Sequence, residues 1–199
     1  MVAGVRSVFL SVLVLGVFTA CSSSSPVRYF SLNPIDADFR QDPEDAVMLG
    51  LGPIRMPDYL NRSQIVWRGD NAEIMVNEFS RWSEPLTKSL LRIVSTDVDN
   101  LLQGVVVVVF PYEPFVRDQV DYRLVGDVNR FDADSTGRIV LEVQWGIASV
   151  KGGVVVPVRR SRYQAQASIA DDPGAVVVAM NDALAQFSRD IAGKLETAL

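Results

Sequence analysis

Residues 139–147 read Ile-Val-Leu-Glu-Val-Gln-Trp-Gly-Ile, and their alternation decides the fold. An apolar side chain at every second position indicates a β-strand with one face toward a core and the other toward water. The same period of two precedes this run, from 121 to 129, and follows it, from 162 to 169. Residues 132–137 (Asp-Ala-Asp-Ser-Thr-Gly) and 151–153 (Lys-Gly-Gly) supply turn residues between the three runs. The sequence therefore predicts a long antiparallel meander.

Two shorter runs upstream have no polar face. Residues 47–51 (Val-Met-Leu-Gly-Leu) are continuously apolar, which favours a strand buried on both faces. Residues 105–110 are five valines and a phenylalanine, and we expect them to form a buried central strand that ends at Pro111. Shorter strands are expected at 27–32 and at 64–68, the second of these in a hairpin with residues 73–77.

Two segments have helical periodicity. In the first, Ser83 is the expected N-cap and Pro85 the expected first residue. The second begins at Pro173 after two aspartates. Their apolar stripes are Leu86, Leu90, Ile93, Val94, Val98, Leu101 and Leu102 in the first helix, and Val177, Met180, Leu184, Phe187, Ile191 and Leu195 in the second. We therefore predict an α/β fold: a single-domain sandwich of a mixed β-sheet, with a long antiparallel meander and two main amphipathic helices.

The N-terminal segment has the features of a secretory signal. Arg6 precedes an apolar run of eleven residues, 8–18, interrupted only by Ser11, and the small residues Thr19 and Ala20 precede the only cysteine, Cys21. Eleven helical residues extend about 16 Å, too short for a hydrocarbon core of about 30 Å. The pattern resembles a bacterial lipobox, in which the cysteine receives fatty acyl groups such as palmitate. The alternative is an ordinary secretory signal with an incidental cysteine.

If residues 18–21 form a lipobox, the chain has three parts. We expect a signal peptide at 1–20, a lipidated tether at 21–27 and one domain at 28–199. In lipoproteins of Gram-negative bacteria, an aspartate directly after the lipidated cysteine tends to retain the protein in the inner membrane. Because Ser22 occupies that position, we expect an outer-membrane lipoprotein that faces the periplasm.

The composition excludes several classes of chemistry. The chain contains no histidine, and lipid on Cys21 would leave no free thiol. The usual zinc and copper sites and the Ser-His-Asp and Cys-His nucleophile systems are therefore excluded. We expect no metal site, no catalytic residue and no cofactor besides the lipid on Cys21. Without Arg6, 18 basic residues face 24 acidic ones, so the charge gives no indication of nucleic-acid binding.

Three charged motifs have simpler explanations than a catalytic site. Residues 132–137 faintly resemble a calcium loop, but Val143 stands where the loop requires its bidentate glutamate, so we predict a tight turn. The acidic stretch 36–45 reads as a solvated loop rather than a pair of catalytic carboxylates. Arg160 and Arg162 share the polar face of their strand, where they either meet phosphate headgroups or simply face water.

Two stretches carry a resemblance to a known family. Residues 50–66 read GLGPIRMPDYLNRSQIV and residues 77–86 read NEFSRWSEPL. They resemble the ABC-type transport auxiliary lipoproteins of the paraquat-inducible protein C type, described as membrane integrity-associated transporter subunits. The resemblance implies an α/β sandwich and a non-enzymatic lipoprotein. It also implies a partner, the MCE-domain protein of a system that carries phospholipid between the two membranes.

The same stretches contain the side chains that we expect to form a partner-binding surface. Tyrosine, tryptophan and arginine are enriched at interface hot spots, and neighbouring prolines restrict the backbone before binding. The candidates are Pro57, Tyr59, Arg62, Arg81, Trp82 and Glu84. In the competing interpretation, Tyr59 and Trp82 are core residues and the arginines cap the helix or pair with Glu84.

Two other functions remain open at this stage. One is an envelope-assembly or secretion-accessory lipoprotein that docks on an outer-membrane β-barrel or a secretin. The other is a small periplasmic hydrolase that uses carboxylates alone and therefore needs a concave pocket lined by at least two acids. The sequence also leaves open a homo-oligomer.

Overall fold

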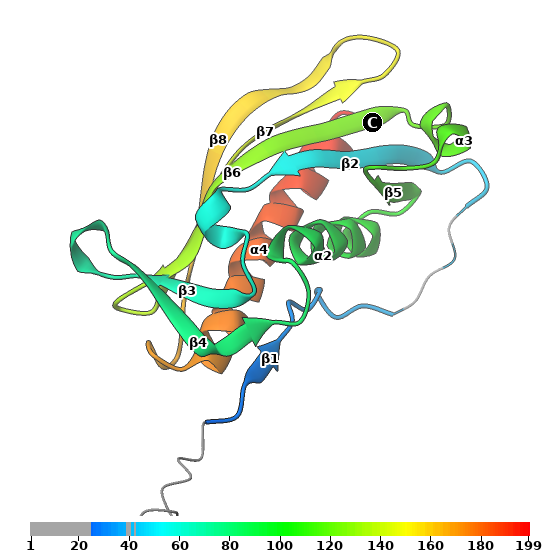
Figure 1. The fold of residues 1–199 in the computed structure, drawn as a ribbon. Coiled ribbons are helices and arrows are strands. Elements are labelled where there is room, and N and C mark those ends of the chain that lie inside the picture. The colour runs from blue at the N-terminus through cyan, green and yellow to red at the C-terminus, as the bar shows by residue number, and fades with distance from the viewer. Residues whose placement is uncertain (1–24, 39–40, 42) are drawn as a thin grey trace, which may run out of the picture.

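The protein is described here from a computed structural model, which covers residues 25–38, 41 and 43–199. These residues form two layers, with a mixed eight-stranded sheet on one side and helices α2 (Leu86–Leu101) and α4 (Pro173–Glu196) packed on one of its faces (Figure 1). The predicted α/β fold is confirmed. The expected signal peptide and Cys21 lie outside the described residues. Within the described residues, no helix has the length and hydropathy needed to cross a bilayer.

The sheet combines parallel and antiparallel pairs. The path runs β1-β4-β3-β6-β2-β5, and β7 pairs with both β6 and β8, which gives the predicted antiparallel meander. Short helices η2 (Asp58–Leu60), η3 (Asp70–Ala72) and α3 (Pro114–Arg117) lie between strands. The strands are β1 (Arg28–Phe30), β2 (Val47–Arg55), β3 (Gln64–Arg68), β4 (Ile74–Trp82), β5 (Val105–Val109), β6 (Tyr122–Asp134), β7 (Arg138–Ser149) and β8 (Val154–Gln166).

On one side of β6 the sheet has two branches: β2 and β5 form one, and β3, β4 and β1 form the other. One edge of β6 pairs with β7 along almost its whole length. The other edge is shared, because β2 pairs with residues 122–127 and β3 pairs with residues 133–134. A register shift against β7 follows Val128, so the core-facing positions change from Leu124 and Val128 to Phe131 and Ala133. The chain between β2 and β3 crosses the gap between the branches.

The core lies between the sheet and the two helices. Every apolar residue predicted on the stripe of α4 is buried. The ring of Trp145 of β7 packs edge to face on the ring of Phe187 of α4, with 5.6 Å between the ring centroids. Helix α4 begins as predicted, with Pro173 in its first turn and the Asp172 carboxylate accepting from the N–H of Ala175 at 2.8 Å. Asp97 of α2 and Ser188 of α4 form a buried hydrogen bond of 2.9 Å between the helices.

The run of valines is the main error in the predicted sheet. Strand β5 is not central, because among the described strands it pairs only with β2 and forms an edge. Val105 and Val107 are buried, while Val106, Val108 and Val109 are only partly covered, and Phe110 is exposed. Strand β2 lies between two neighbours, and of the residues predicted to be buried on both faces, Leu49, Gly50 and Leu51 are buried while Val47 and Met48 are only partly covered.

Three element boundaries also differ from the prediction. Ser83 is not the N-cap of α2, because the helix begins at Leu86 with Pro85 at the cap position. The turn predicted at 132–137 is shorter, since β6 continues through Asp134. The last strand ends at Gln166, which leaves Ile169 exposed beyond it.

Candidate partner-binding surface

Two connections of the chain form a hollow of about 320 Å³. One connection joins β2 to β3 and the other joins β4 to α2. They are held together by the backbone N–H of Trp82, which donates to the carbonyl of Ser63 at 2.6 Å. The N–H of Ser83 donates to Phe30 of β1 at 2.8 Å. The residues that line the hollow are Asn61, Arg62, Ser63, Trp82, Ser83, Glu84 and Pro85.

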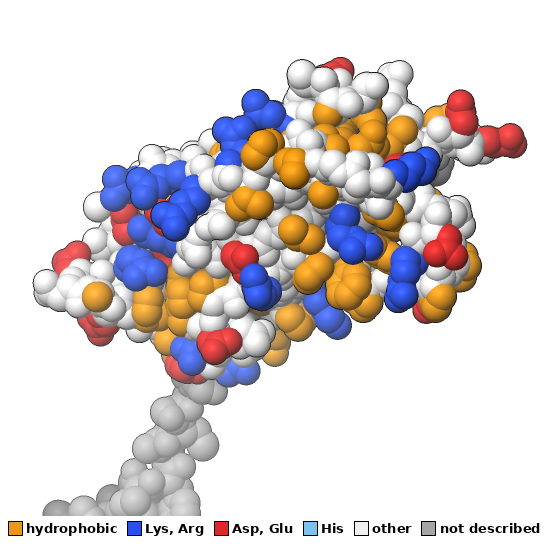
Figure 2. Space-filling model, turned by 90° about the horizontal axis from the view of Figure 1, so that it is seen from above, with side chains coloured by type: hydrophobic (Ala, Val, Ile, Leu, Met, Phe, Trp, Pro, Cys, Tyr) orange, Lys and Arg blue, Asp and Glu red, His pale blue; other side chains and the backbone are white. Residues whose placement is uncertain are grey.

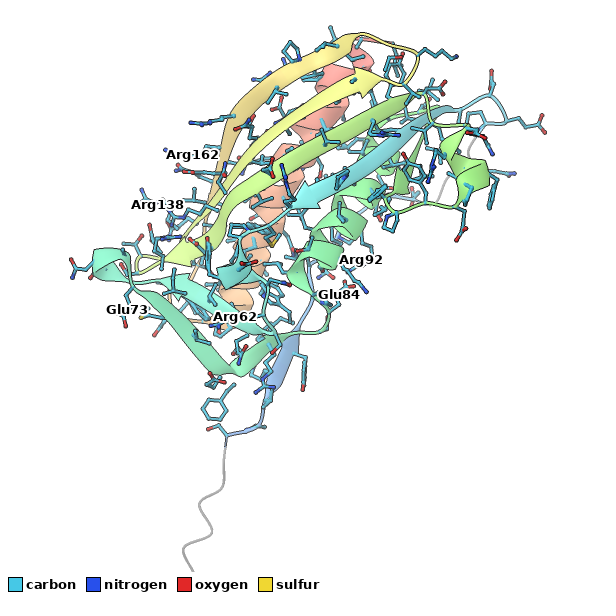
Figure 3. The ribbon with its side chains drawn as sticks, turned by 45° about the horizontal axis from the view of Figure 1, so that its top comes forward. Arg62, Glu73, Glu84, Arg92, Arg138 and Arg162 are labelled. Carbon is cyan, nitrogen blue, oxygen red and sulfur yellow. The ribbon has the colours of Figure 1, made fainter. Side chains whose placement is uncertain are left out.

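The structure therefore brings together three of the six residues predicted to bind a partner. Arg62 is exposed at the rim of the hollow. Glu84 forms an ion pair of 2.6 Å with Arg92 of α2, which lowers the pKa of its carboxyl group (Figure 3). The partner of Glu84 is thus neither of the arginines proposed in the competing interpretation. Arg81 lies outside the lining, half-buried, with its Nε donating to the carbonyl of Glu78 at 3.4 Å.

Trp82 is a core residue, as the competing interpretation holds. Only 6% of its surface is exposed, and it belongs to the same apolar cluster as Leu86 and Leu90 of α2. Its backbone pairs with Phe30 of β1. Trp82 therefore supports the hollow from beneath and offers a partner little surface of its own.

Tyr59 and Pro57 belong to the connection between β2 and β3, but neither lines the hollow. Pro57 is the N-cap of η2. The hydroxyl of Tyr59 donates to the carboxylate of Asp132 at 2.7 Å, and burial together with that hydrogen bond raises the pKa of Tyr59. Arg68 stacks over the Tyr59 ring at 5.6 Å and donates to the same carboxylate at 3.0 Å. Arg130 donates to its other oxygen at 2.7 Å.

This cluster of Tyr59, Arg68, Arg130 and Asp132 fills the gap between the branches of the sheet. Asp132 is 1% exposed, and burying it is tolerable because two guanidinium groups and a hydroxyl meet its oxygens. Sequence reasoning missed Arg68, Arg130 and Asp132 as a group and assigned Asp132 to a turn. A weak signal was present, since Arg130 and Asp132 lie two residues apart and therefore project from the same face of a strand.

The outer face of the sheet, opposite α2 and α4, carries mixed side chains. Figure 2 shows apolar and basic groups side by side there. Arg160 and Arg162 are both exposed on β8, as predicted, and Arg162 forms an ion pair of 2.7 Å with Glu142 of β7. Part of this basic face is therefore already neutralised by its own strand neighbour.

The carboxylates of the described residues do not form a catalytic pair. The predicted tight turn after β6 uses Asp134, which accepts from Thr136 and Arg138 and whose pKa is lowered to about 2. Asp134 does line a groove with Glu78 and Asp171, but the last two are exposed to solvent. A hydrolase would need one carboxyl group with a raised pKa beside an ionised one. Among the described residues, no group of three or more potential ligands could hold a metal ion.

Comparisons with known proteins found a matching family model and several solved structures of similar fold. The family model described as "ABC-type transport auxiliary lipoprotein component" matches residues 30–192. An uncharacterized protein of known crystal structure is 19% identical, with a TM-score of 0.70 over 86% of this chain and 99% of that one. No curated protein sequence matches significantly.

Two further structures have related folds. Protein XCC0632 from Xanthomonas campestris is 20% identical, with a TM-score of 0.65 over 86% of this chain and 100% of that one. The hypothetical protein CT253 from Chlamydia trachomatis is 9% identical, with a TM-score of 0.50 over 77% of this chain and 97% of that one. At these sequence identities the solved structures support the fold alone. The assignment to a family rests on the match to the family model.

Proposed function

The chain belongs to the family of ABC-type transport auxiliary lipoprotein components, and from this membership we propose that it is the outer-membrane lipoprotein of an MCE-type system that moves lipid between two membranes. The observation that carries the proposal is the family match, which begins nine residues after Cys21 and extends into α4. The lipid on Cys21 would fix the domain to the periplasmic face of the membrane. The domain itself would act by binding, without catalysis.

In this proposal the hollow between Arg62 and Glu84 receives the MCE-domain protein. The backbone on both sides is fixed before binding by Pro57, Pro85 and the hydrogen bond between Trp82 and Ser63. A rigid rim loses little conformational entropy when a partner binds, so a few contacts suffice for specificity. Arg62 is the most available contact, because it is exposed and an arginine can donate to a carboxylate or carbonyl of the partner.

Affinity purification from detergent-solubilised envelopes tests the proposal. We expect the tagged protein to recover an MCE-domain protein, and Arg62→Ala to reduce that recovery. Arg117→Ala is a matched control, because Arg117 is also exposed but lies on α3, outside the hollow. Recovery of β-barrel-assembly or secretin subunits without an MCE-domain protein would contradict the proposal and favour the envelope-assembly function.

A further inference from the structure

A larger groove lies where the β3–β4 hairpin extends past the start of α4. Its volume is about 510 Å³, within the usual range for small-molecule sites, and its lining is mostly apolar. Trp67 of β3 and Met75 and Phe79 of β4 contribute side chains to it. Met75 and Phe79 are 42% and 48% exposed, so their apolar side chains are accessible to a ligand. Trp67 is buried, and its indole N–H has no hydrogen-bond partner among the described residues.

The opposite wall of the groove is held in place by close packing. It comprises the turn after β6 and the segment before α4, where Ser135 and Ala170 line the groove. Gly137 has a φ of +77°, and a Cβ there would lie 2.6 Å from the Cα of Ala170. The N–H of Ala167 donates to the carbonyl of Gly137 at 2.9 Å. The groove therefore exists before any ligand arrives.

Strand β4, which contributes to the groove, pairs with β1 at the end of the domain where the described chain begins (Figure 1). Strand β1 runs parallel to β4 with Arg28 opposite Ser80. Val27 directly precedes Arg28, and Phe79 of the groove directly precedes Ser80. Val27 lies six positions after Cys21, and an extended chain spans about 3.3–3.6 Å per residue. If Cys21 carries the anchor, as the proposed function requires, Val27 lies within about 20 Å of the membrane surface.

The charges at the groove favour one class of headgroup. Glu78 and Asp171 are exposed and line it, and none of the described residues that line it is a lysine or arginine. Glu78 accepts a hydrogen bond from the neutral side chain of Gln64 at 3.2 Å, and no ion pair is found for Glu78 or Asp171 among the described residues. Two carboxylates without a counter-charge attract an ammonium group and repel a lipid of net negative charge. The apolar lining between them suits a hydrocarbon chain.

We propose that this groove binds one acyl chain of a phospholipid that has an ammonium headgroup, taken from the membrane leaflet that holds the anchor. The chain lies against Met75, Phe79 and the Trp67 ring. The headgroup ammonium lies between Glu78 and Asp171. The domain thereby contacts lipid directly, at a site separate from the hollow proposed for the protein partner.

Fluorescence quenching tests this site. The mature lipoprotein in non-ionic detergent micelles is titrated with phosphatidylethanolamine that carries bromine on its acyl chain, and tryptophan emission is recorded. Bromine quenches indole only at short range, so we expect saturable quenching that Trp67→Phe removes. Trp82 and Trp145 are buried in the core and lie outside the groove lining.

Two comparisons make the expectation specific. Met75→Asp, which keeps all three tryptophans, should weaken the apparent affinity by about tenfold or more. Val158→Asp makes the same kind of change at an exposed apolar residue of β8 outside this groove, and should have no effect. Brominated phosphatidylglycerol should bind about two- to fivefold more weakly, as expected for exposed charge interactions.

Undiminished quenching in Met75→Asp or in Trp67→Phe would overturn the lipid site. Absent quenching would also overturn it. In that case, lower recovery of the MCE-domain protein by Met75→Asp would assign the groove to a protein partner, and a smaller oligomeric mass would assign it to a second copy of this chain. The quenching does not depend on capture of an MCE-domain protein, so failure of the proposed function and failure of the lipid site can be distinguished.

Discussion

Tyr59 and Asp132 are 73 residues apart in sequence, yet the tyrosine hydroxyl donates to the carboxylate at 2.7 Å. This hydrogen bond fastens the connection between β2 and β3 to the last residues of β6, just before the positions that pair with β3. It links the connection that carries Arg62 to a buried charge cluster, so the position of Arg62 depends on residues outside the hollow.

The first prediction concerns that cluster. Asp132→Asn should destabilise the protein by about 3 kcal/mol, because it leaves the charges of Arg68 and Arg130 without their counter-charge. Both guanidinium side chains are partly exposed, at 31% and 21%, so we expect a value at the low end for a broken buried pair. Tyr59→Phe should cost about 1 kcal/mol, the usual value of one hydrogen bond. Urea unfolding measures both, and equal costs for the two variants would contradict this account of Asp132.

The second prediction separates binding from packing at the hollow. Arg62→Ala should change the free energy of unfolding by less than about 0.5 kcal/mol and should weaken capture of the partner. Trp82→Ala should cost about 3–5 kcal/mol, because it leaves a cavity in the core. Thermal melts and a pull-down distinguish the two effects. If Arg62→Ala melts normally and still binds like wild type, the interface lies elsewhere, with the face of Arg160 and Arg162 the next candidate.

The third prediction concerns pH. Burial raises the pKa of Asp97 above its usual value near 3.8, against the hydrogen bonds from Ile35 and Ser188. The folded state therefore binds the proton of the Asp97 carboxyl group more tightly than the unfolded state does. Asp97 contributes fully to the free energy of unfolding at pH values below its pKa in the unfolded state. That contribution is lost as pH rises through the folded pKa.

Asp97→Asn isolates this effect, because an amide can accept from Ile35 and donate to Ser188 without a charge. The variant should be at least as stable as wild type at pH 7, and the difference should shrink as pH falls toward 3. Asp97→Ala should cost about 1–3 kcal/mol, because it leaves buried polar groups unsatisfied. Urea unfolding across that pH range measures the trend, and a gap between Asn and wild type that widens toward acid would reverse the assigned sign.

The fourth prediction concerns the anchor. Cys21→Ser should leave an uncleaved or soluble periplasmic form that has lost its function but keeps its fold. Incorporation of radioactive palmitate checks this directly, with wild type labelled and the variant unlabelled. Circular dichroism should be unchanged. Wild-type protein that takes up no label would remove the basis for a lipid anchor.

The fifth prediction concerns sorting between membranes. Ser22→Asp should move the lipoprotein to the inner membrane, because the residue after the lipidated cysteine determines the destination. Sucrose-gradient fractions of the envelope report the location, and Ser23→Asp is the matched control. Equal distributions of wild type and Ser22→Asp would show that this rule does not apply here.

Local patterns predicted the elements well but not their neighbours. The alternation of β7 fixes which of its residues face the core, and every one of those from Ile139 to Ile147 is buried. The run of valines in β5 could not reveal an edge strand, because valine suits a strand with one neighbour as well as one with two. The phase change after Val128 depends on how β6 pairs with β7, which a single strand's sequence does not encode.

The candidate surface was predicted only in part, again because local patterns do not reveal contacts between distant segments. Arg62 and Glu84 stand out by residue type, and both line the hollow. The charged cluster beneath Tyr59 depends on contacts between residues 59 and 132, and such long-range contacts leave no periodic signal. Trp82 was a candidate for binding because tryptophan is common at interfaces, but the same apolar ring is equally suited to the core.

If Cys21 carries the anchor, as the proposed function requires, strand β1 gives that attachment a response to mechanical load. Among the described strands it pairs only with β4, through three positions, whereas Leu32 just beyond it is buried in the core. A pull on the anchor would peel β1 away before it disturbed Leu32. Release of residues 28–31 would lengthen the attachment by about 14 Å. The domain would then follow its partner away from the bilayer without unfolding, and would return when the tension ceased.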